Sequence, residues 1–324
     1  MYLAVQDVSN LKRLLINTIM STPKMSVVLS FIGNMPPYIY ECLKQLRLFY
    51  QDDIYLIYSI IAPELKTQIE TFNPILISYD TVISSRFNNT CSKRNYAVVD
   101  KLNDRKLLFM RSFERFYLLD ELIKQRNLKY IWFMELDILM YTSPNTFIET
   151  LKDIPTAFAY HRTDHCNSGI FYVKDTEALQ PILTSFDNFT EGFISEMRAL
   201  FAYSAKIKHE SLFFPLVIKS SENRLYWKDI DLFNGYLFDG AILGMYYFGI
   251  DPIHTNGKII TNNKHTYDMD QKFLNIWKYG DLIWQSNQDK LQIPYFKLKE
   301  SEQLIPVANL HIHSKDLKSA VSYR

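Results

Sequence analysis

The sequence predicts an α/β fold with a mainly parallel central sheet and helices on both faces of that sheet. In the first half of the chain, short apolar, β-branched runs alternate with longer segments of helical periodicity. Strands that alternate with helices in this way are typical of a parallel sheet covered by helices. The chain has 324 residues, of which 48% are hydrophobic and 22% charged, so it can bury a large core.

The chain is expected to form one domain with an N-terminal extension. No internal repeat, low-complexity segment or Pro/Gly/Ser-rich linker divides it, so residues 25–324 are predicted to form a single domain. Residues 1–24 are predicted to be a helical extension. Apolar residues recur there at helical spacing, at Leu11, Leu14, Leu15 and Ile19. Charged residues interrupt this segment, so it is interpreted as a packing helix and not as a signal peptide.

Apolar runs and helical periodicity place the elements along the chain. Predicted strands are Met25–Ile32, Ile54–Ile61, Pro74–Tyr79, Lys129–Met134, Ala157–Tyr160, Ile170–Val173 and Asn309–His313. Predicted helices are one that ends near Phe49, one that opens at Pro63, and Lys106–Arg126, Met197–Ala205 and Ala241–Phe248. After about residue 175 the pattern is less regular, and the predicted boundaries there are correspondingly broad.

The charge balance argues against several classes of protein. With 36 basic and 35 acidic residues and no long basic run, a nucleic-acid partner is not expected. No apolar run approaches the ~20 residues that span a bilayer, so no transmembrane segment is predicted, although peripheral membrane contact stays open. The absence of a G-x-G-x-x-G pattern argues against a dinucleotide-dependent dehydrogenase.

Three cysteines, far apart and never in a C-x-x-C pair, argue against a disulfide framework and a cysteine zinc site. A reducing compartment is the simpler interpretation. We therefore expect a cytoplasmic protein.

Glu135-Leu136-Asp137 is the strongest local signal for chemistry, because it follows the apolar run KYIWFM. In an extended chain the two carboxylates share one side, while Leu136 points into the core. Ligands of open α/β sheets bind at the carboxyl ends of strands. Two carboxylates there suit Mn²⁺ or Mg²⁺, which neutralises the charge of a nucleotide diphosphate. Alone, the pattern is more typical of a solvated strand-to-loop junction.

Two further motifs support this interpretation. Cys166-Asn167-Ser168-Gly169 is predicted as a polar turn that enters an apolar strand. Near the end of the chain, His311 and His313 alternate on a short strand and share a face, so one of them is a candidate third metal ligand. Lys315 follows, where it can contact a phosphate.

The order ELD, NSG and then HxHSK resembles glycosyltransferases of the GT-A fold. In detail it is most similar to bacterial and viral proteins distantly related to the glycogenin-like, family-eight type. This resemblance implies the cytoplasm of a bacterium or, for a viral source, of the host. The resemblance covers most of residues 25–318 and includes the segment FDGAILG at 238–244. Two departures stand out: the first acidic position is Glu135, and no glycine separates the last histidine from Lys315.

The resemblance implies a metal-dependent transfer of a hexosyl or pentosyl group to a glycan or other hydroxyl acceptor in glycan biosynthesis. The donor it implies is a nucleotide-sugar, with a UDP-sugar preferred. Asp137 would bind the metal with help from Glu135, and either His311 or His313 would complete the site. The residues implied in donor binding are Phe31, Gly33 and Asn34 for the base and ribose, Arg115 and Asn167 for the sugar or for orienting the carboxylates, and Lys315 for the pyrophosphate.

Two carboxylates are candidates for the catalytic step. Asp239 is a candidate general base towards the acceptor hydroxyl, with a helix N-cap as the structural alternative. Glu196 is a second candidate, against a charge interaction at a helix N-terminus. Residues of other possible sites are His161, Asp164, His165 and Cys166, expected in a polar loop, and Trp227, Trp277 and Trp284, expected on the acceptor side.

Two other functions fit the same scaffold. A sugar nucleotidyltransferase shares the sheet and the acidic metal ligands, but it usually has a glycine-rich basic loop after the first strand. The segment FIGNMPP is a poor match to such a loop. A non-catalytic glycan-binding protein is the second alternative, and the presence of both ELD and HxHSK argues against it.

Overall fold

A computed structural model describes residues 23–92, 94, 107–162, 165–190, 195–206, 211–216, 229–251 and 279–324. All but the last two residues of the predicted N-terminal extension lie outside this part, so the division at residue 24 stays a prediction. None of the helices in the described ranges combines the length and apolar character that crossing a bilayer requires.

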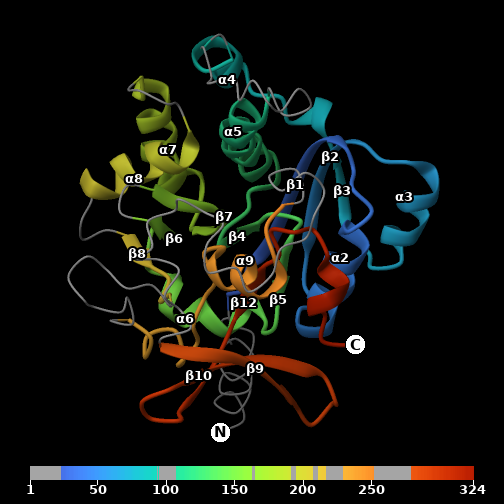
Figure 1. Ribbon diagram of the computed structural model, residues 1–324. Helices are drawn as coiled ribbons and strands as arrows, with labels where there is room; N and C mark the ends of the chain where they lie inside the picture. The colour runs from blue at the N-terminus through green and yellow to red at the C-terminus, as the bar shows by residue number, and fades with distance from the viewer. Residues whose placement is uncertain are drawn as a thin grey trace, which may run out of the picture.

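A seven-stranded sheet organises the molecule, in the order β3-β2-β1-β4-β7-β6-β8 (Figure 1). Its strands are β1 (Ser26–Asn34), β2 (Ile54–Ile60), β3 (Ile75–Ser78), β4 (Ile131–Met134), β6 (Thr156–Arg162), β7 (His165–Val173) and β8 (Ser211–Phe213). Strands β3, β2, β1 and β4 run parallel to one another, as do β6 and β8. Strand β7 is antiparallel to both of its neighbours. The predicted α/β class with a mainly parallel sheet is confirmed.

Helices cover both faces of this sheet. The described helices are α2 (Ile39–Phe49), α3 (Pro63–Glu70), α4 (Ser85–Thr90), α5 (Leu108–Arg126), α6 (Ile148–Leu151), α7 (Thr176–Asn188), α8 (Glu196–Lys206) and α9 (Ile242–Phe248). Alternate residues of β4 enter two separate cores: Trp132 belongs to the core that includes residues of α2, whereas Phe133 belongs to the core that includes residues of α5, α7 and α8. The apolar runs of the sequence predict buried strands because each face of the sheet has its own core.

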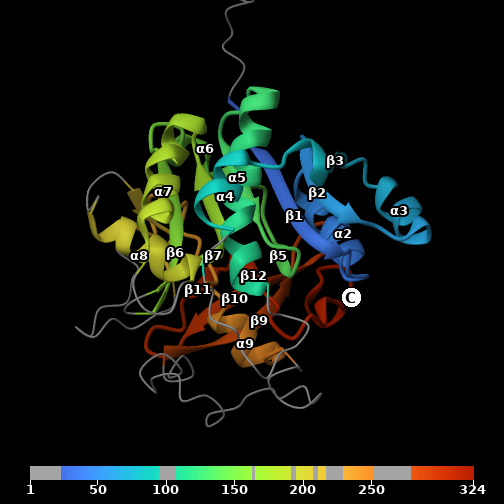
Figure 2. The same ribbon diagram turned by 90° about the horizontal axis from the view of Figure 1, so that it is seen from above.

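Two smaller sheets lie on the α2 side (Figure 2). Strands β9 (Gly280–Ser286), β10 (Gln292–Leu298) and β11 (Leu304–Pro306) form an antiparallel sheet in the order β11-β10-β9. Strand β12 (Asn309–His311) pairs antiparallel with β5 (Ile138–Met140), and His311 lies opposite Ile138. This short pairing brings the C-terminal histidines to the end of β4, and it is the feature of the fold that assembles the site.

Two local predictions are wrong. Asn167, Ser168 and Gly169 do not form a turn, because they lie inside β7, where every residue is buried. His161 to Cys166 is not a polar loop either: β6 runs to Arg162 and β7 begins at His165. The polarity of these residues misleads because the two strands pair on both sides and the buried polar side chains find partners inside the protein.

Candidate metal and nucleotide-sugar site

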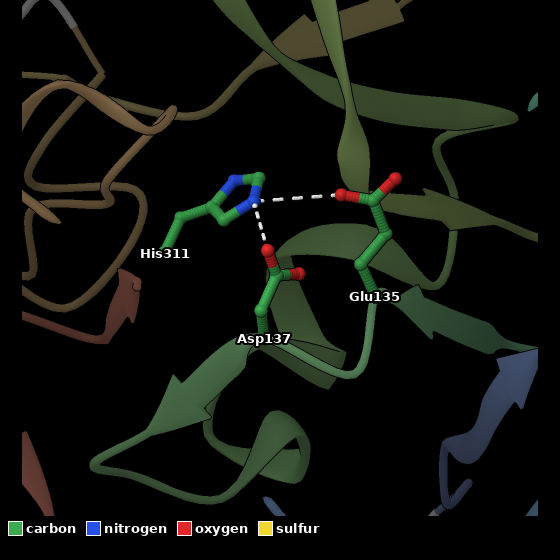
Figure 3. A group of neighbouring side chains, drawn as sticks. All are labelled: Glu135, Asp137 and His311. Atoms are coloured by element: carbon green, nitrogen blue, oxygen red, sulfur yellow. Dashed lines mark hydrogen bonds and ion pairs between the residues drawn. The ribbon is translucent and has the colours of Figure 1, made fainter. Parts of the chain in front are cut away.

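Glu135, Asp137 and His311 converge at the carboxyl end of β4 (Figure 3). The His311 Nε2 atom lies 3.1 Å from Asp137 Oδ2 and 3.5 Å from Glu135 Oε2. One ligand atom from each residue lies within 4.8 Å of the others. Asp137 and His311 are buried and Glu135 is half-buried. Two carboxylates and one imidazole nitrogen at this spacing are suitable ligands for Mn²⁺ or Mg²⁺.

The two carboxylates face the same side because of a turn and not because of strand alternation. Strand β4 ends at Met134, Leu136 and Asp137 form a turn, and the Ile138 amide donates to the Glu135 carbonyl over 3.2 Å. Leu136 is buried in the core, as predicted. The Ile312 amide donates to the Asp137 carbonyl over 2.7 Å, which ties this turn to the chain just after β12.

Lys315 places a positive charge beside Asp137. Its Nζ atom contacts Asp137 Oδ2, the same oxygen that faces His311. Burial alone would raise the pKa of Asp137, but Lys315 and His311 hold it well below its ordinary value. Burial likewise opposes the charge of His311, yet Asp137 and Glu135 raise the pKa of His311 above 6.5. Lys315, and His311 when it is protonated, thus balance the negative charge of Asp137.

Arg115 links the carboxylate cluster to a second buried acid. It comes from α5, and its guanidinium contacts Glu135 Oε1 and Ser168 Oγ. The same guanidinium lies 3.5 Å from Glu196 Oε1, to which Ser168 Oγ donates over 2.9 Å. Burial raises the pKa of Glu196 although Arg115 opposes this shift. Glu196 therefore belongs to the same polar cluster as Glu135.

Gly169 keeps the centre of the cluster open. A Cβ atom at this position would lie 2.7 Å from Glu135 Oε2 and 3.1 Å from His311 Cε1. The neighbouring Asn167 accepts the Gly169 amide over 2.7 Å and donates to the Gly240 carbonyl over 3.2 Å. The NSG motif pointed to this region, but the need for a glycine becomes visible only when β4, β7 and β12 are placed together.

Asp239 lies beside β12 and is fully buried. Its carboxylate accepts the amides of Leu243, Gly244 and His311 over 2.9, 2.8 and 3.0 Å. Asn309 adds a reciprocal pair of hydrogen bonds to the Asp239 backbone, each 3.1 Å long. These contacts join the first turn of α9 to the strand that carries His311. They give Asp239 a structural role in two elements. The N-cap position of α9 is Ala241, so Asp239 accepts the amides of the first turn from two residues before the N-cap.

The structure separates the two candidate histidines. His311 faces Glu135 and Asp137, whereas His313 Nδ1 accepts the Asp251 amide over 3.2 Å. Burial lowers the pKa of His313 to about 3. Their ring centroids lie 5.9 Å apart. Of the two histidines that the sequence left open, His311 is the one that lies in the cluster.

The predicted base and ribose residues lie at the end of β1, which pairs directly with β4. Phe31 is half-buried and packs against the core, and Asn34 is exposed. Gly33 has a φ of +124°, and its amide donates to Ser59 Oγ over 2.7 Å at an irregularity in the β1–β2 pairing. This position favours glycine because other residues rarely adopt such a φ.

Trp284 is used in packing. It makes edge contacts with Tyr141 and Phe248, and the Arg324 guanidinium lies 3.9 Å from its ring centroid. The ring is half-buried, and its stacking on an acceptor sugar stays a prediction. Trp227, Trp277 and Asp164 lie outside the described residues, as do details of the His161 side chain. His165 and Cys166 are both buried within β7.

Unpartnered polar atoms gather in the same cluster. Within the described ranges, six buried side-chain polar atoms have no hydrogen-bond partner, and Arg115 Nε, Glu196 Oε2 and His311 Nδ1 are three of them. Buried polar groups in native proteins are nearly always satisfied, so unsatisfied ones call for an explanation. Arg115 Nε and Glu196 Oε2 therefore offer polar partners to a ligand beside them, whereas His311 Nδ1 lies on the ring side opposite the Nε2 atom that faces Glu135 and Asp137 (Figure 3).

Comparisons with known proteins concern the fold. No protein-family model and no curated protein matches the chain. The glycosyltransferase GlyE of Streptococcus pneumoniae TIGR4 is 14% identical over 59% of this chain and 45% of its own, with a TM-score of 0.37. Mouse xyloside xylosyltransferase 1 is 12% identical over 65% of this chain and 93% of its own, with a TM-score of 0.36.

Glucosyl-3-phosphoglycerate synthase of Mycobacterium tuberculosis, in complex with Mn²⁺, UDP and phosphoglyceric acid, is 11% identical over 59% of this chain and 67% of its own, with a TM-score of 0.35. A cytidylyltransferase is among the matches as well. The chain thus spans less than half of the pneumococcal protein. Likeness at these identities and TM-scores carries no inference about chemistry.

Proposed function

We propose that this chain is a metal-dependent glycosyltransferase of the GT-A, glycogenin-like type that transfers a sugar from a nucleotide-sugar, preferably a UDP-sugar, to a glycan or other hydroxyl acceptor. One observation carries the proposal: Glu135, Asp137 and His311 converge at the carboxyl end of β4, with Lys315 beside them. Hard-cation ligands next to a lysine are the groups that a nucleotide diphosphate needs.

Asp137 and His311 would hold Mn²⁺ or Mg²⁺, with Glu135 assisting. When bound, the ion would neutralise the charge of the diphosphate leaving group. Glu135 also pairs with Arg115, which supports the assisting role that its longer side chain suggests. Phe31, Gly33 and Asn34 would lie along the base and ribose, since β1 and β4 are neighbours. Arg115 and Asn167 would orient the donor sugar.

Of the two carboxylates proposed for the acceptor side, Glu196 is better suited to contact a reacting hydroxyl. Its Oε2 atom is buried and without a partner among the described residues, and burial raises its pKa. Both oxygens of Asp239 instead accept backbone amides. A general base needs an oxygen that is able to take the proton, so Asp239 fits a positioning role more closely.

A product assay separates this function from its alternatives. The protein is incubated with UDP-sugars, Mn²⁺ and hydroxyl acceptors, and separately with nucleoside triphosphates and sugar 1-phosphates. Release of UDP with formation of a glycoside supports the proposal. Release of pyrophosphate would identify a nucleotidyltransferase, and glycan binding without either product would identify a binding protein.

A further inference from the structure

We propose that Lys315 is a built-in cation that competes with the metal ion for Asp137, so that the ion and the nucleotide diphosphate bind cooperatively. The inference rests on the proposed function and extends it to the order in which the ligands assemble. In the ligand-free protein Lys315 neutralises Asp137. When the diphosphate arrives, the ammonium moves to it, and Asp137 becomes available to the ion.

The competition follows from a shared atom. Lys315 Nζ and His311 Nε2 both contact Asp137 Oδ2, and His311 also faces Glu135. A divalent ion held by Asp137 and His311 would have to lie between them, next to an ammonium group of the same sign. Like charges this close oppose one another strongly inside a protein, where water screens them weakly. Metal binding therefore requires that Lys315 leave Asp137.

The structure allows the side chain of Lys315 to leave while its backbone stays in place. The Lys315 side chain is 31% exposed, whereas that of Asp137 is 5% exposed. The Lys315 amide donates to the Ile312 carbonyl over 2.9 Å, and the Ile312 amide is bound to Asp137. The long, flexible side chain of a lysine can carry its charge several ångströms by rotation about its own bonds.

The charges explain why the two ligands would enter together. Glu135 and Asp137 are already paired with Arg115 and Lys315. A divalent ion alone adds two positive charges to this balanced group. The diphosphate of a nucleotide-sugar carries two negative charges, so the ion and the diphosphate together leave the net charge unchanged. The released ammonium then has a phosphate oxygen as its partner.

The test is Mn²⁺ binding, measured by the electron paramagnetic resonance of the free ion and without any turnover. The parent, Lys315→Met and Lys318→Met are titrated with MnCl₂ alone and in the presence of UDP. Lys318 is the matched control, because it is nearby, its side chain is 80% exposed, and its contact is with Glu41 at 3.6 Å. Lys315→Gln, which keeps a polar group without the charge, is a second variant.

Lys315→Met is expected to bind Mn²⁺ alone at least tenfold more tightly than the parent. UDP should strengthen Mn²⁺ binding in the parent and have much less effect in Lys315→Met, and Lys318→Met should behave as the parent does. Lys315→Gln should lie between the parent and Lys315→Met.

Equal or weaker Mn²⁺ binding by a folded Lys315→Met would overturn the inference while leaving the metal site intact. Failure of both Lys315 variants to fold would overturn it as well, because the ion pair would then be a structural one. If neither the parent nor any variant binds Mn²⁺ with or without UDP, the proposed metal-dependent function fails and the inference fails with it.

Discussion

At the scale of single residues, Asp137 has the largest role, because His311 and Lys315 both contact its side chain. Asp137→Ala removes the buried carboxylate that would bind the ion. We expect metal-stimulated transfer to fall by about 100-fold or more, the scale that single electrostatic groups contribute in active sites. UDP release with and without Mn²⁺ measures this. Full activity of the parent in EDTA, or of the variant with Mn²⁺, would contradict the metal assignment.

Substituting His311 and substituting His313 should give different results. His311→Ala removes an imidazole that faces both carboxylates, so it should weaken Mn²⁺-dependent nucleotide binding. His313→Ala removes a side chain that accepts the Asp251 amide, so its effect should be mainly on stability. Calorimetric titration with UDP and Mn²⁺, together with melting temperatures, separates the two effects. The reverse order would move the ligand role to His313.

Asp239→Asn tests whether this residue acts as a base or holds His311 in place. Three amides donate to the carboxylate, and asparagine offers only one acceptor oxygen, so one or more of them loses its partner. Leaving a buried donor unsatisfied costs about 1–3 kcal/mol. We expect a lower melting temperature and weaker Mn²⁺ binding. An unchanged melting temperature and Mn²⁺ affinity with roughly 100-fold slower transfer would instead identify a general base.

At the scale of the elements, β7 limits how much room the ligand has. Gly169→Ala would place a methyl group 2.7 Å from Glu135 Oε2 and 3.1 Å from His311 Cε1. Such contacts require the cluster to shift, so we expect Mn²⁺ and UDP affinity to fall at least tenfold. Gly235→Ala is the control: its φ of +77° makes it strained, but its Cβ would meet nothing within 4 Å. It should lower stability and leave Mn²⁺ binding unchanged.

The sequence predicts an element well when its buried residues are apolar, and poorly when its buried residues are polar. Strands β1, β2 and β4 and helix α5 are recognisable because their apolar residues follow the period of the element. The polar part of β7 is not recognisable, because its Asn167 and Ser168 are satisfied by the Gly240 carbonyl and Glu196, which are distant in sequence. Hydrophobic periodicity distinguishes buried from exposed positions only where polar side chains face water, and these two side chains are buried.

The same limit applies to the site. ELD and HxHSK supplied residues that the structure brings together in the candidate site, but alternation alone left His311 and His313 equivalent. The pairing of β12 with β5 distinguishes them, because it places His311 opposite Ile138, the residue that follows Asp137. Such a three-residue pairing has too little sequence for a periodic signal. Local patterns therefore gave the candidates, and the tertiary pairing selects among them.

At the scale of the whole molecule, the buried charges of the site should make stability depend on pH. Burial raises the pKa of Glu196 above its ordinary value of 4.5 in the folded protein. The folded state therefore favours the protonated form. The stabilisation from this proton is complete below the unfolded pKa and is lost as the pH rises through the folded pKa.

Glu196→Gln removes this dependence because glutamine carries no titratable proton. The difference in melting temperature, variant minus parent, should increase as the pH rises from about 4.5, the unfolded pKa. Each unit of pKa shift corresponds to about 1.4 kcal/mol, so the trend is measurable by thermal denaturation at a series of pH values. Glu300→Gln, at an exposed position, is the control and should show no such trend.

If the two variants gave parallel curves, Glu196 would be ionised equally in the folded and unfolded states, and Arg115 and Ser168 would fully compensate its burial. The buried acid would then be an anion held by Arg115, and a raised pKa could no longer support its role towards a reacting hydroxyl.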